Sequence, residues 1–128
     1  MTAKHIPVPS EEEEQVTLFN WARMQEGKYP ELKLMFHIPN GGLRSKSEAA
    51  RFKRAGVKAG VPDICLPSAK GGRHGLFIEL KKLTGGRASK EQKAWIAALE
   101  NAGYAASVCC GWQEASRVIM TYLEERLP

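Results

Sequence analysis

The sequence predicts a single α/β domain in which helices flank a central mixed β-sheet. Segments with the apolar periodicity of helices alternate with short apolar runs typical of strands. Their order along the chain is helix, strand, helix, strand, strand, helix, strand, helix, which is the pattern of one layered α/β unit. The chain has 128 residues, enough to bury one core, and its 43% hydrophobic and 26% charged residues exclude disordered and fibrous classes.

A capping pattern opens the first predicted helix. Residues 1–9 contain two prolines and are expected to form a flexible N-terminal arm, with the folded domain spanning 10–128. Ser10 and Glu13 match a capping box, and the helix should run over 11–26. Its apolar stripe consists of Val16, Leu18, Phe19 and Ala22.

A strand and a second, shorter helix should follow. The run over 32–39 is typical of a strand, and the Asn-Gly-Gly sequence at 40–42 predicts a turn after it. Ser45 and Glu48 match a second capping box, which begins a helix that ends at Gly56. The residues of this helix expected to face the core are Ala49, Ala50 and Phe52.

The second half of the chain is predicted to begin with a β-hairpin. Strands are expected over 61–66 and 75–80, and the loop between them is centred on Gly71-Gly72. Ser89 and Gln92 then match a third capping box.

The helix that this third box begins is expected to end near Gly103. A strand over 104–110 and a closing helix over 112–127 complete the chain. The apolar stripe of the third helix consists of Trp95, Ile96 and Leu99.

Basic residues gather in the middle of the chain. The net charge is +5, and the span 43–93 contains thirteen Lys and Arg residues but only four acidic residues. A segment this basic favours an anionic partner, with nucleic acid as the leading candidate. The alternative is a set of solvated charged faces that keep the protein soluble.

Cysteine and histidine usage indicates a reducing, cytoplasmic setting. The three cysteines form no CxxC pair, and Cys65 and Cys109 fall in apolar runs where cysteine behaves as a small hydrophobic residue. The three histidines are scattered, which argues against a zinc site. No signal peptide opens the chain and no apolar run approaches membrane-spanning length, so no membrane partner is expected.

Three charged residues lie inside the two runs of the predicted hairpin. Side chains alternate across a strand, so Glu79 and Lys81 share one face. In a hairpin that turns at Gly71-Gly72, the residue opposite Asp63 lies near position 79 or 80. The three charges are therefore expected to form one cluster. The alternative is a salt bridge between Glu79 and Lys81 on a half-exposed strand.

The pairing of Asp63 with Glu79 suggests a metal site. Two neighbouring carboxylates repel each other, which pushes the pKa of one of them upward. A divalent cation relieves that repulsion, and oxygen ligands of this kind suit Mg²⁺ or Mn²⁺. Such an ion can activate water and stabilise charge on a phosphodiester. Lys81, on the same face, could orient the attacking water or neutralise the phosphate.

The stretch "GVPDI" followed by "FIELKK" resembles the motif of the PD-(D/E)XK nuclease superfamily, and specifically of its VRR-NUC branch. Other segments are similar to that branch: "EEEEQ" in the first helix, "IPNGG", "GVKAGVPDI", "SKEQKAWI" and "GWQEA". The likeness covers residues 10–124. It implies a restriction-endonuclease-like core for the mixed sheet.

The resemblance assigns roles to the charged cluster. It implies that Asp63 and Glu79 are metal ligands, with the backbone carbonyl of Leu80 as a third, and that Lys81 is the catalytic lysine. It also implies that Gln92 is an active-site residue, although the capping-box position of Gln92 accounts for it equally well.

The family also uses a glutamate from the first helix, and this chain has four in a row. At about 100° per residue, Glu11 lies on the apolar stripe and Glu12 near its edge. Glu13 and Glu14 are expected to point further away, and Glu13 already serves the capping box. Glu11 is therefore the expected catalytic glutamate, with Glu12 and Glu14 as alternatives. Favourable charge at a helix N-terminus would explain most of the run without any catalytic role.

The resemblance further implies a nucleic-acid-binding surface. Backbone amides at Gly41 and Gly42 and the Asn40 side chain would approach the strand, although the three residues could simply form a turn. Basic residues would then bind phosphates, which sets affinity without reading sequence. A solvated basic face is the alternative. These basic residues are Arg44, Arg51, Lys53, Arg54 and Lys58.

The activity implied by the resemblance is that of a Mg²⁺-dependent DNA endonuclease in which Mn²⁺ substitutes, with no small-molecule cofactor. Stand-alone members of the branch resemble Holliday-junction resolvases, so a homodimer acting on branched DNA is expected, in recombination, repair or phage DNA processing. No further domain is expected beside the nuclease module. The alternatives are a flap- or restriction-type endonuclease using the same site, and a non-catalytic DNA-binding module on the same fold.

Overall fold

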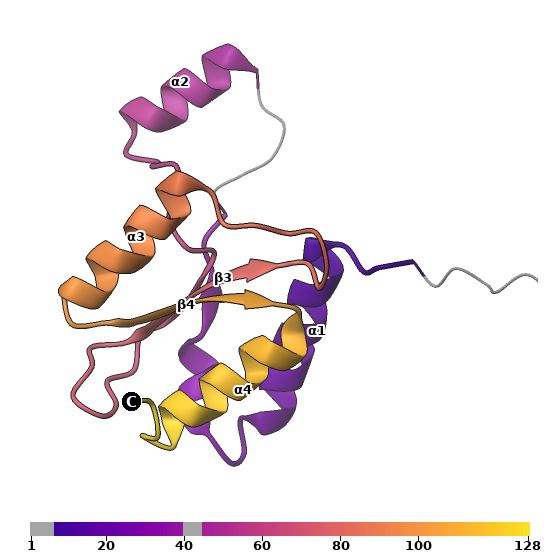
Figure 1. The fold of residues 1–128 in the computed structure, drawn as a ribbon, viewed down its shortest axis with the longest axis vertical. Coiled ribbons are helices and arrows are strands. Elements are labelled where there is room, and N and C mark those ends of the chain that lie inside the picture. The colour runs from indigo at the N-terminus through magenta and orange to yellow at the C-terminus, as the bar shows by residue number, and fades with distance from the viewer. Residues whose placement is uncertain (1–6, 40–44) are drawn as a thin grey trace, which may run out of the picture.

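The computed structural model describes residues 7–39 and 45–128. Most of the predicted arm and the whole of the turn predicted at 40–42 lie outside the described residues. The predicted α/β domain with a mixed sheet is confirmed (Figure 1). Its elements are α1 (Glu11–Gln25), η1 (Pro30–Leu34), β1 (Phe36–His37), α2 (Lys46–Arg54), β2 (Ile64–Leu66), β3 (Leu76–Lys81), α3 (Lys90–Asn101), β4 (Ala105–Cys110) and α4 (Trp112–Leu123).

The four strands form one sheet in the order β1-β2-β3-β4. The pairs β1–β2 and β2–β3 are antiparallel, whereas β3 and β4 run parallel. A parallel pair needs a crossover connection, and α3 supplies it. Helices α1 and α4 pack against each other and against β3, while α3 packs against β4 from the other side (Figure 1). None of the helices in the described part of the chain is long and apolar enough to cross a membrane.

The β2–β3 hairpin turns where the sequence predicted. Gly71 and Gly72 have φ values of 56° and 79°, a region that glycine occupies without steric cost. The end of the chain holds this loop in place. The Gly71 amide donates to Oε1 of Glu125 (3.1 Å), and the Tyr122 hydroxyl donates to the Ser68 carbonyl (2.6 Å). The connection between the two charged strands is therefore anchored to α4 and the residues that follow it.

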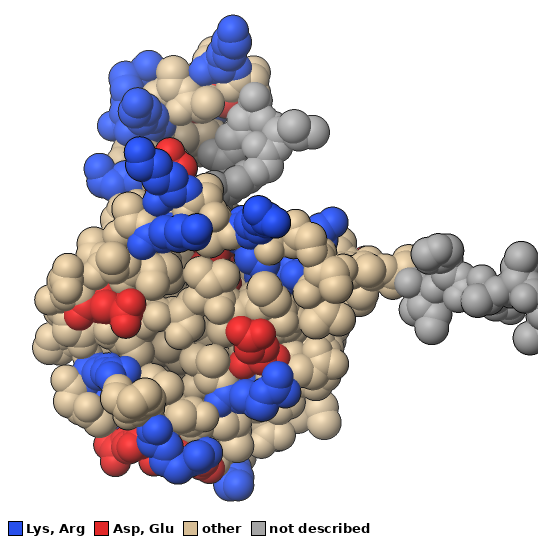
Figure 2. Space-filling model, in the orientation of Figure 1, with Lys and Arg blue, Asp and Glu red and all other residues tan. Residues whose placement is uncertain are grey.

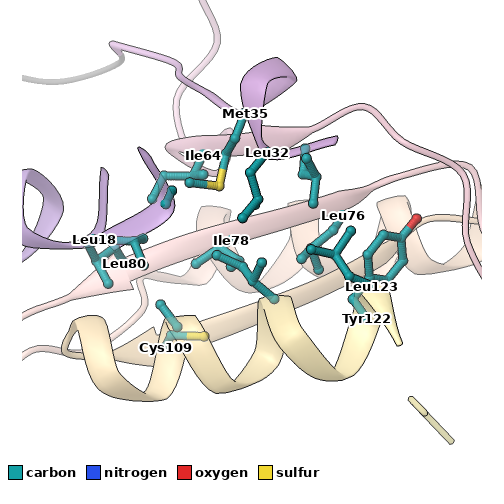
Figure 3. Close-up of a cluster of buried hydrophobic side chains, with 14 of the residues drawn as sticks. Leu18, Leu32, Met35, Ile64, Leu76, Ile78, Leu80, Cys109, Tyr122 and Leu123 are labelled. Atoms are coloured by element: carbon teal, nitrogen blue, oxygen red, sulfur yellow. The ribbon is translucent and has the colours of Figure 1, made fainter. Parts of the chain in front are cut away.

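The hydrophobic core lies between the sheet and helices α1 and α4 (Figure 3). Leu76, Ile78 and Leu80 are each 1% exposed, so one face of β3 is buried as strand alternation predicted. Leu18 of α1 is fully buried against them. Val16, in contrast, is 53% exposed, so its place in the predicted stripe is wrong. It lies about 200° around the helix from Leu18.

The strand predicted over 32–39 is only partly confirmed. Residues 32–34 belong to η1, which begins at Pro30, whose fixed φ suits the first position of a helix, and only the two residues of β1 pair with β2. Leu32 and Met35 are the buried residues. Their three-residue spacing matches one 3₁₀ turn, whereas a strand would bury alternate residues.

The capping patterns begin the helices as predicted. The capping boxes of α1 and α3 each contain both reciprocal hydrogen bonds, and Ser45 accepts a hydrogen bond from the Glu48 amide at the start of α2. The end of α4 differs from the prediction. It lies at Leu123 rather than at 127, and Glu125 has a φ of 58°, which a helix cannot continue through.

Helix α2 stands away from the sheet (Figure 1). None of its residues is buried: Ala49 and Ala50 are exposed and Phe52 is half-buried. The prediction that these three residues face the core is therefore wrong. They are the only apolar residues among the nine of the helix, and so short an apolar face buries too little surface to hold the helix against the domain.

A buried carboxylate joins α1 to α4. Glu14 is 3% exposed, and its Oε1 accepts a hydrogen bond from the Trp112 amide in the first turn of α4 (3.1 Å). The first amides of a helix have no acceptor within it, and Gly111, the N-cap of α4, offers no side-chain cap, so a residue of α1 accepts from one of these amides instead. The expectation that Glu14 points away from the stripe is wrong, because helical geometry puts it about 40° from Leu18.

Replacing Glu14 with alanine should lower the free energy of unfolding by about 1–3 kcal/mol, because the Trp112 amide would lose its acceptor at a buried position. Glu14→Gln keeps an oxygen acceptor and should lose less. Urea unfolding followed by circular dichroism measures both, with Glu12→Ala, an exposed change on the same helix, as the control. Equal unfolding midpoints for the two alanine variants would show that the capping bond contributes nothing.

Candidate active site

The predicted charged residues line one cleft of about 640 Å³. It lies where β2 begins and β3 ends, and the first turns of α1 and α3 contribute to its walls. Its lining residues are Glu11, Glu12, Gln15, His37, Pro39, Gly60, Val61, Asp63, Glu79, Leu80, Lys81 and Gln92.

Asp63 immediately precedes β2 and is fixed by the neighbouring strand. Ile64 pairs with Ile78, and continuing this register by one residue places Asp63 opposite Glu79. The Oδ1 atom of Asp63 accepts a hydrogen bond from the Leu80 amide (3.0 Å). The predicted proximity of Asp63 and Glu79 is confirmed, because antiparallel pairing alone brings the two together.

Glu79 and Lys81 form a buried ion pair on the same face of β3. Oε2 of Glu79 lies 3.5 Å from Nζ of Lys81, and the two residues are 3% and 9% exposed. The alternative of a salt bridge on a half-exposed strand is therefore wrong. A buried pair of this kind holds its charged groups in fixed directions and screens them from solvent.

The two carboxylates carry raised pKa values. Burial, followed by the charge of Asp63, raises the pKa of Glu79 to about 7, while the charge and hydrogen bond of Lys81 oppose the shift. Burial also raises the pKa of Asp63, against the hydrogen bond from the Leu80 amide. The predicted upward shift is confirmed, although burial contributes more to it than repulsion does. One lysine does not fully compensate two carboxylates in this cleft.

The side chains of the four glutamates of α1 have different surroundings and different partners. Glu11 and Glu12 line the cleft, and the charge of Glu11 contributes to the raised pKa values of both Asp63 and Glu79. Glu13 exchanges two hydrogen bonds of 3.1 Å with Ser10 in the capping box. The remaining one, Glu14, points into the contact between α1 and α4.

The Gln92 side chain takes part in the capping box of α3 and also lines the cleft, as expected. Its Oε1 accepts a hydrogen bond from the Ser89 amide (2.7 Å), which completes the capping box of α3. The same side chain lines the cleft. Because the amide oxygen is engaged in the cap, the amide NH₂ is the part of Gln92 with donors left to offer.

The cleft also contains residues that were not singled out from the sequence, and His37 and Gly60 are two of them. Nδ1 of His37 lies 2.8 Å from the Asp63 carbonyl oxygen, and since a carbonyl only accepts, Nδ1 is the donor in this hydrogen bond. Gly60 has a φ of 91°, and a Cβ there would lie 2.7 Å from the carbonyl carbon of Glu91. The glycine before Val-Pro-Asp was a usable signal, whereas nothing distinguished His37 from an ordinary strand residue.

Four of the eight predicted nucleic-acid-binding residues are described by the structure. Asn40, Gly41, Gly42 and Arg44 lie outside the described residues. Arg51, Lys53 and Arg54 are exposed on α2, and Lys58 is exposed in the loop after it. Figure 2 shows Lys and Arg side chains gathered over this end of the molecule. None of these four described residues lines the cleft itself.

The donors around Asp63 and Glu79 fit a hard divalent cation. No group of three or more His, Cys, Asp or Glu side chains within residues 7–39 and 45–128 is placed to hold a metal ion. The Asp63 carboxylate keeps Oδ2 free of the Leu80 bond. The Leu80 carbonyl points to the same side of β3 as its amide, toward Asp63. Two carboxylates and a carbonyl are donors that Mg²⁺ accepts while it keeps several waters.

The chain resembles known proteins over most of its length. The VRR-NUC domain model matches residues 10–113, a range that includes every lining residue of the cleft. A solved structure described as a VRR_NUC domain protein is 37% identical, covers 93% of this chain and 92% of its own, and superposes with a TM-score of 0.81. A search of curated proteins found no match.

Without divalent metal, stability should fall as the pH rises from about 4.5 to about 7. In that window an unfolded chain has released the Glu79 proton while the folded chain keeps it. The folded state then binds more protons, so the free energy of unfolding decreases with pH. The Glu79 contribution is about 3 kcal/mol at most.

Urea unfolding in a chelator at several pH values, compared with Glu79→Gln, isolates this contribution. The stability of the wild type relative to the variant should decline across the window. Parallel pH profiles for the two proteins would contradict the raised pKa of Glu79.

Proposed function

The chain belongs to the VRR-NUC domain family, which indicates a nuclease-type function, and on that premise we propose that it is a metal-dependent endonuclease that hydrolyses phosphodiester bonds in DNA. The observation that carries the proposal is the cluster in an open cleft of half-buried Asp63 with buried Glu79 and Lys81. Two poorly solvated carboxylates with raised pKa values are unfavourable for stability, and such groups concentrate at functional sites. A module that only binds DNA has no need of clustered carboxylates near phosphates.

The carboxylates of Asp63 and Glu79, with the Leu80 carbonyl, are the groups that would hold the metal. We propose Mg²⁺, with Mn²⁺ as a substitute, because the donors are all oxygen atoms. When bound, such an ion supplies positive charge that stabilises a phosphodiester under attack and lowers the pKa of a coordinated water. The Leu80 amide orients the Asp63 carboxylate by the 3.0 Å hydrogen bond. Glu11, on the wall beside them, is the proposed additional carboxylate.

Lys81 supplies a fixed positive charge at the reacting phosphate. Its ammonium is held 3.5 Å from Glu79 and is largely shielded from solvent. In that position it either orients the attacking water or offsets negative charge that develops on the phosphate oxygens. Gln92, on the same cleft, presents its NH₂ group as a hydrogen-bond donor to a phosphate oxygen.

Helix α2 is the proposed contact with the DNA backbone. Arg51, Lys53, Arg54 and Lys58 are exposed, and the helix is free of packing against the core. Cations of this kind bind phosphates and set the affinity and its salt dependence without reading sequence. The charge gathered at this end of the molecule (Figure 2) would hold a duplex arm while the cleft acts on one strand.

We further propose that the preferred substrate is branched DNA such as a Holliday junction, cut by a homodimer. A four-way junction has two symmetry-related strands to cut, and each chain would contribute the charged cleft described above. An isologous dimer presents two identical sites related by a two-fold axis, which matches the symmetry of the junction. Recombination, repair and phage DNA processing are the processes in which such an activity would be used.

Variants of the cleft should lose cleavage, whereas variants of α2 should lose DNA affinity. Asp63→Ala and Lys81→Ala should each reduce cleavage in Mg²⁺ by about 10²-fold or more, with DNA affinity changed only a few-fold. The double variant Lys53→Ala with Arg54→Ala should weaken binding instead, and reduce the slope of log affinity against log salt by about 0.9 for each phosphate that the protein no longer neutralises.

Fluorescence anisotropy and gel cleavage assays measure the two effects separately. Lys33→Ala, an exposed change in η1 away from both places, is the matched control. Wild-type activity in Asp63→Ala or Lys81→Ala would mean that the site is misassigned. A wild-type protein that binds DNA but leaves it uncut in both Mg²⁺ and Mn²⁺ would remove the nuclease proposal.

The protein should be a dimer in solution and should nick four-way junctions at symmetric positions. Light scattering after size-exclusion chromatography reports the mass, and a panel of junction, flap, tailed and fully paired DNAs reports the preference. A monomer, or equal cleavage of plain duplex and junction, would count against resolvase activity. Cleavage confined to flaps or to one duplex sequence would instead identify a flap- or restriction-type enzyme.

A further inference from the structure

A second hollow, of about 280 Å³, adjoins the candidate active site. We call it the α1 groove, and its lining residues are Gln15, Val16, Phe19, Arg23 and His37. Gln15 and His37 also line the active-site cleft, so the two spaces adjoin at these two residues. A strand that leaves the cleft on this side would reach the groove by passing these two residues.

One stripe of α1 builds the groove. Gln15, Phe19 and Arg23 are spaced four residues apart, so they lie one above another along the helix. From Gln15 to Arg23 the helix rises about 12 Å. This stripe lies beside the core-facing one, since Phe19 is only partly buried and Arg23 is exposed. The helix thus offers an amide, an aromatic ring and a guanidinium in order of distance from the cleft.

The chemistry of this stripe fits a single nucleic-acid strand. An aromatic ring in an open groove is a stacking platform for a base, and cations beside it bind the backbone. Arg23 donates one N–H to Oδ1 of Asn20 (2.9 Å), and its guanidinium has further N–H donors that can bind a phosphate. The Gln15 side-chain amide supplies a donor and an acceptor where the groove adjoins the cleft. A rise of about 12 Å corresponds to between three and four base steps of about 3.4 Å.

We propose that the α1 groove holds an unpaired nucleotide of the substrate strand next to the scissile phosphate, with its base stacked on Phe19 and a phosphate on Arg23. The inference rests on the proposed function and narrows the substrate class. A base inside an intact duplex is stacked and paired, so it cannot enter the groove. The enzyme therefore prefers DNA that has an unpaired nucleotide beside the cut, at a branch point, a flap or a single-stranded tail.

The duplex part of such a substrate has a separate place on the protein. The basic residues of α2 stand well apart from α1 (Figure 1), and they are suited to phosphates rather than to bases. Paired DNA on α2 and an unpaired strand in the α1 groove would approach the cleft from different sides. The two surfaces together make the transition from paired to unpaired DNA the recognised feature.

The test compares two DNAs that differ only in one nucleotide beside the cut, either paired or unpaired. Binding is measured by anisotropy in the Lys81→Ala background with a chelator present, so that cleavage is suppressed, and 2-aminopurine at the unpaired position reports stacking. Phe19→Ala should weaken binding of the unpaired DNA by about 5- to 100-fold, reduce the quenching of 2-aminopurine, and leave the paired DNA unchanged. Phe19→Trp should keep both effects.

Phe36→Ala is the matched control, because Phe36 is a 47% exposed aromatic residue outside the groove. Arg23→Ala, an exposed change that leaves the core intact, should also weaken only the unpaired DNA, which keeps the test informative if Phe19→Ala unfolds. Equal losses for both DNAs, or equal effects of Phe19→Ala and Phe36→Ala, would overturn the inference.

The outcomes separate this inference from the nuclease proposal. A wild-type protein that cuts paired and unpaired DNAs equally, with Phe19→Ala unchanged, would overturn the groove and leave the nuclease proposal standing. Preferential binding of the unpaired DNA without any cleavage in Mg²⁺ or Mn²⁺ would support the groove and remove the nuclease proposal.

Discussion

The backbone at the end of strand β3 is held from both sides, and the site depends on that arrangement. The Leu80 amide donates to Asp63 of the preceding strand segment (3.0 Å), while the Lys81 carbonyl accepts from Gly111 (2.9 Å). The amide of Trp112, the first residue of α4, donates to Oε1 of Glu14 in α1 (3.1 Å). One row of hydrogen bonds therefore crosses β2, β3, α4 and α1. Because Glu11 lies one turn before Glu14, the same row also sets where the glutamates of α1 meet the cleft.

These hydrogen bonds explain how the fold keeps two poorly solvated carboxylates close together. Glu79 and Asp63 are close together and poorly solvated, and burial keeps the pKa of both carboxyls high. In a looser structure the two would separate and become hydrated. Here the antiparallel register and the flanking helices hold them together, so stability provided elsewhere by the core maintains a charge arrangement that does not stabilise the protein itself.

The sequence was sufficient wherever a local rule determines the structure. The capping boxes that begin with Ser10 and Ser89, the glycine turn of the hairpin and the hairpin register that brings Asp63 beside Glu79 all depend on segments near in the chain. The errors arose where contacts between distant segments decide. The role of Glu14 requires the start of α4, and the segment 32–39 is shaped by which residues the core accepts. Helix periodicity likewise does not reveal that α2 has no surface to pack against.

The isolation of α2 from the core has a consequence for how this protein can change over time. Substitutions in most of a compact domain are limited by what folding allows. Helix α2 buries no residue, so its charges can be added, lost or rearranged with little effect on the rest of the domain. The residues of the cleft can then be inherited unaltered while the charge carried by α2 changes. Conservation in this domain should accordingly be uneven, strict around the end of β3 and relaxed along α2.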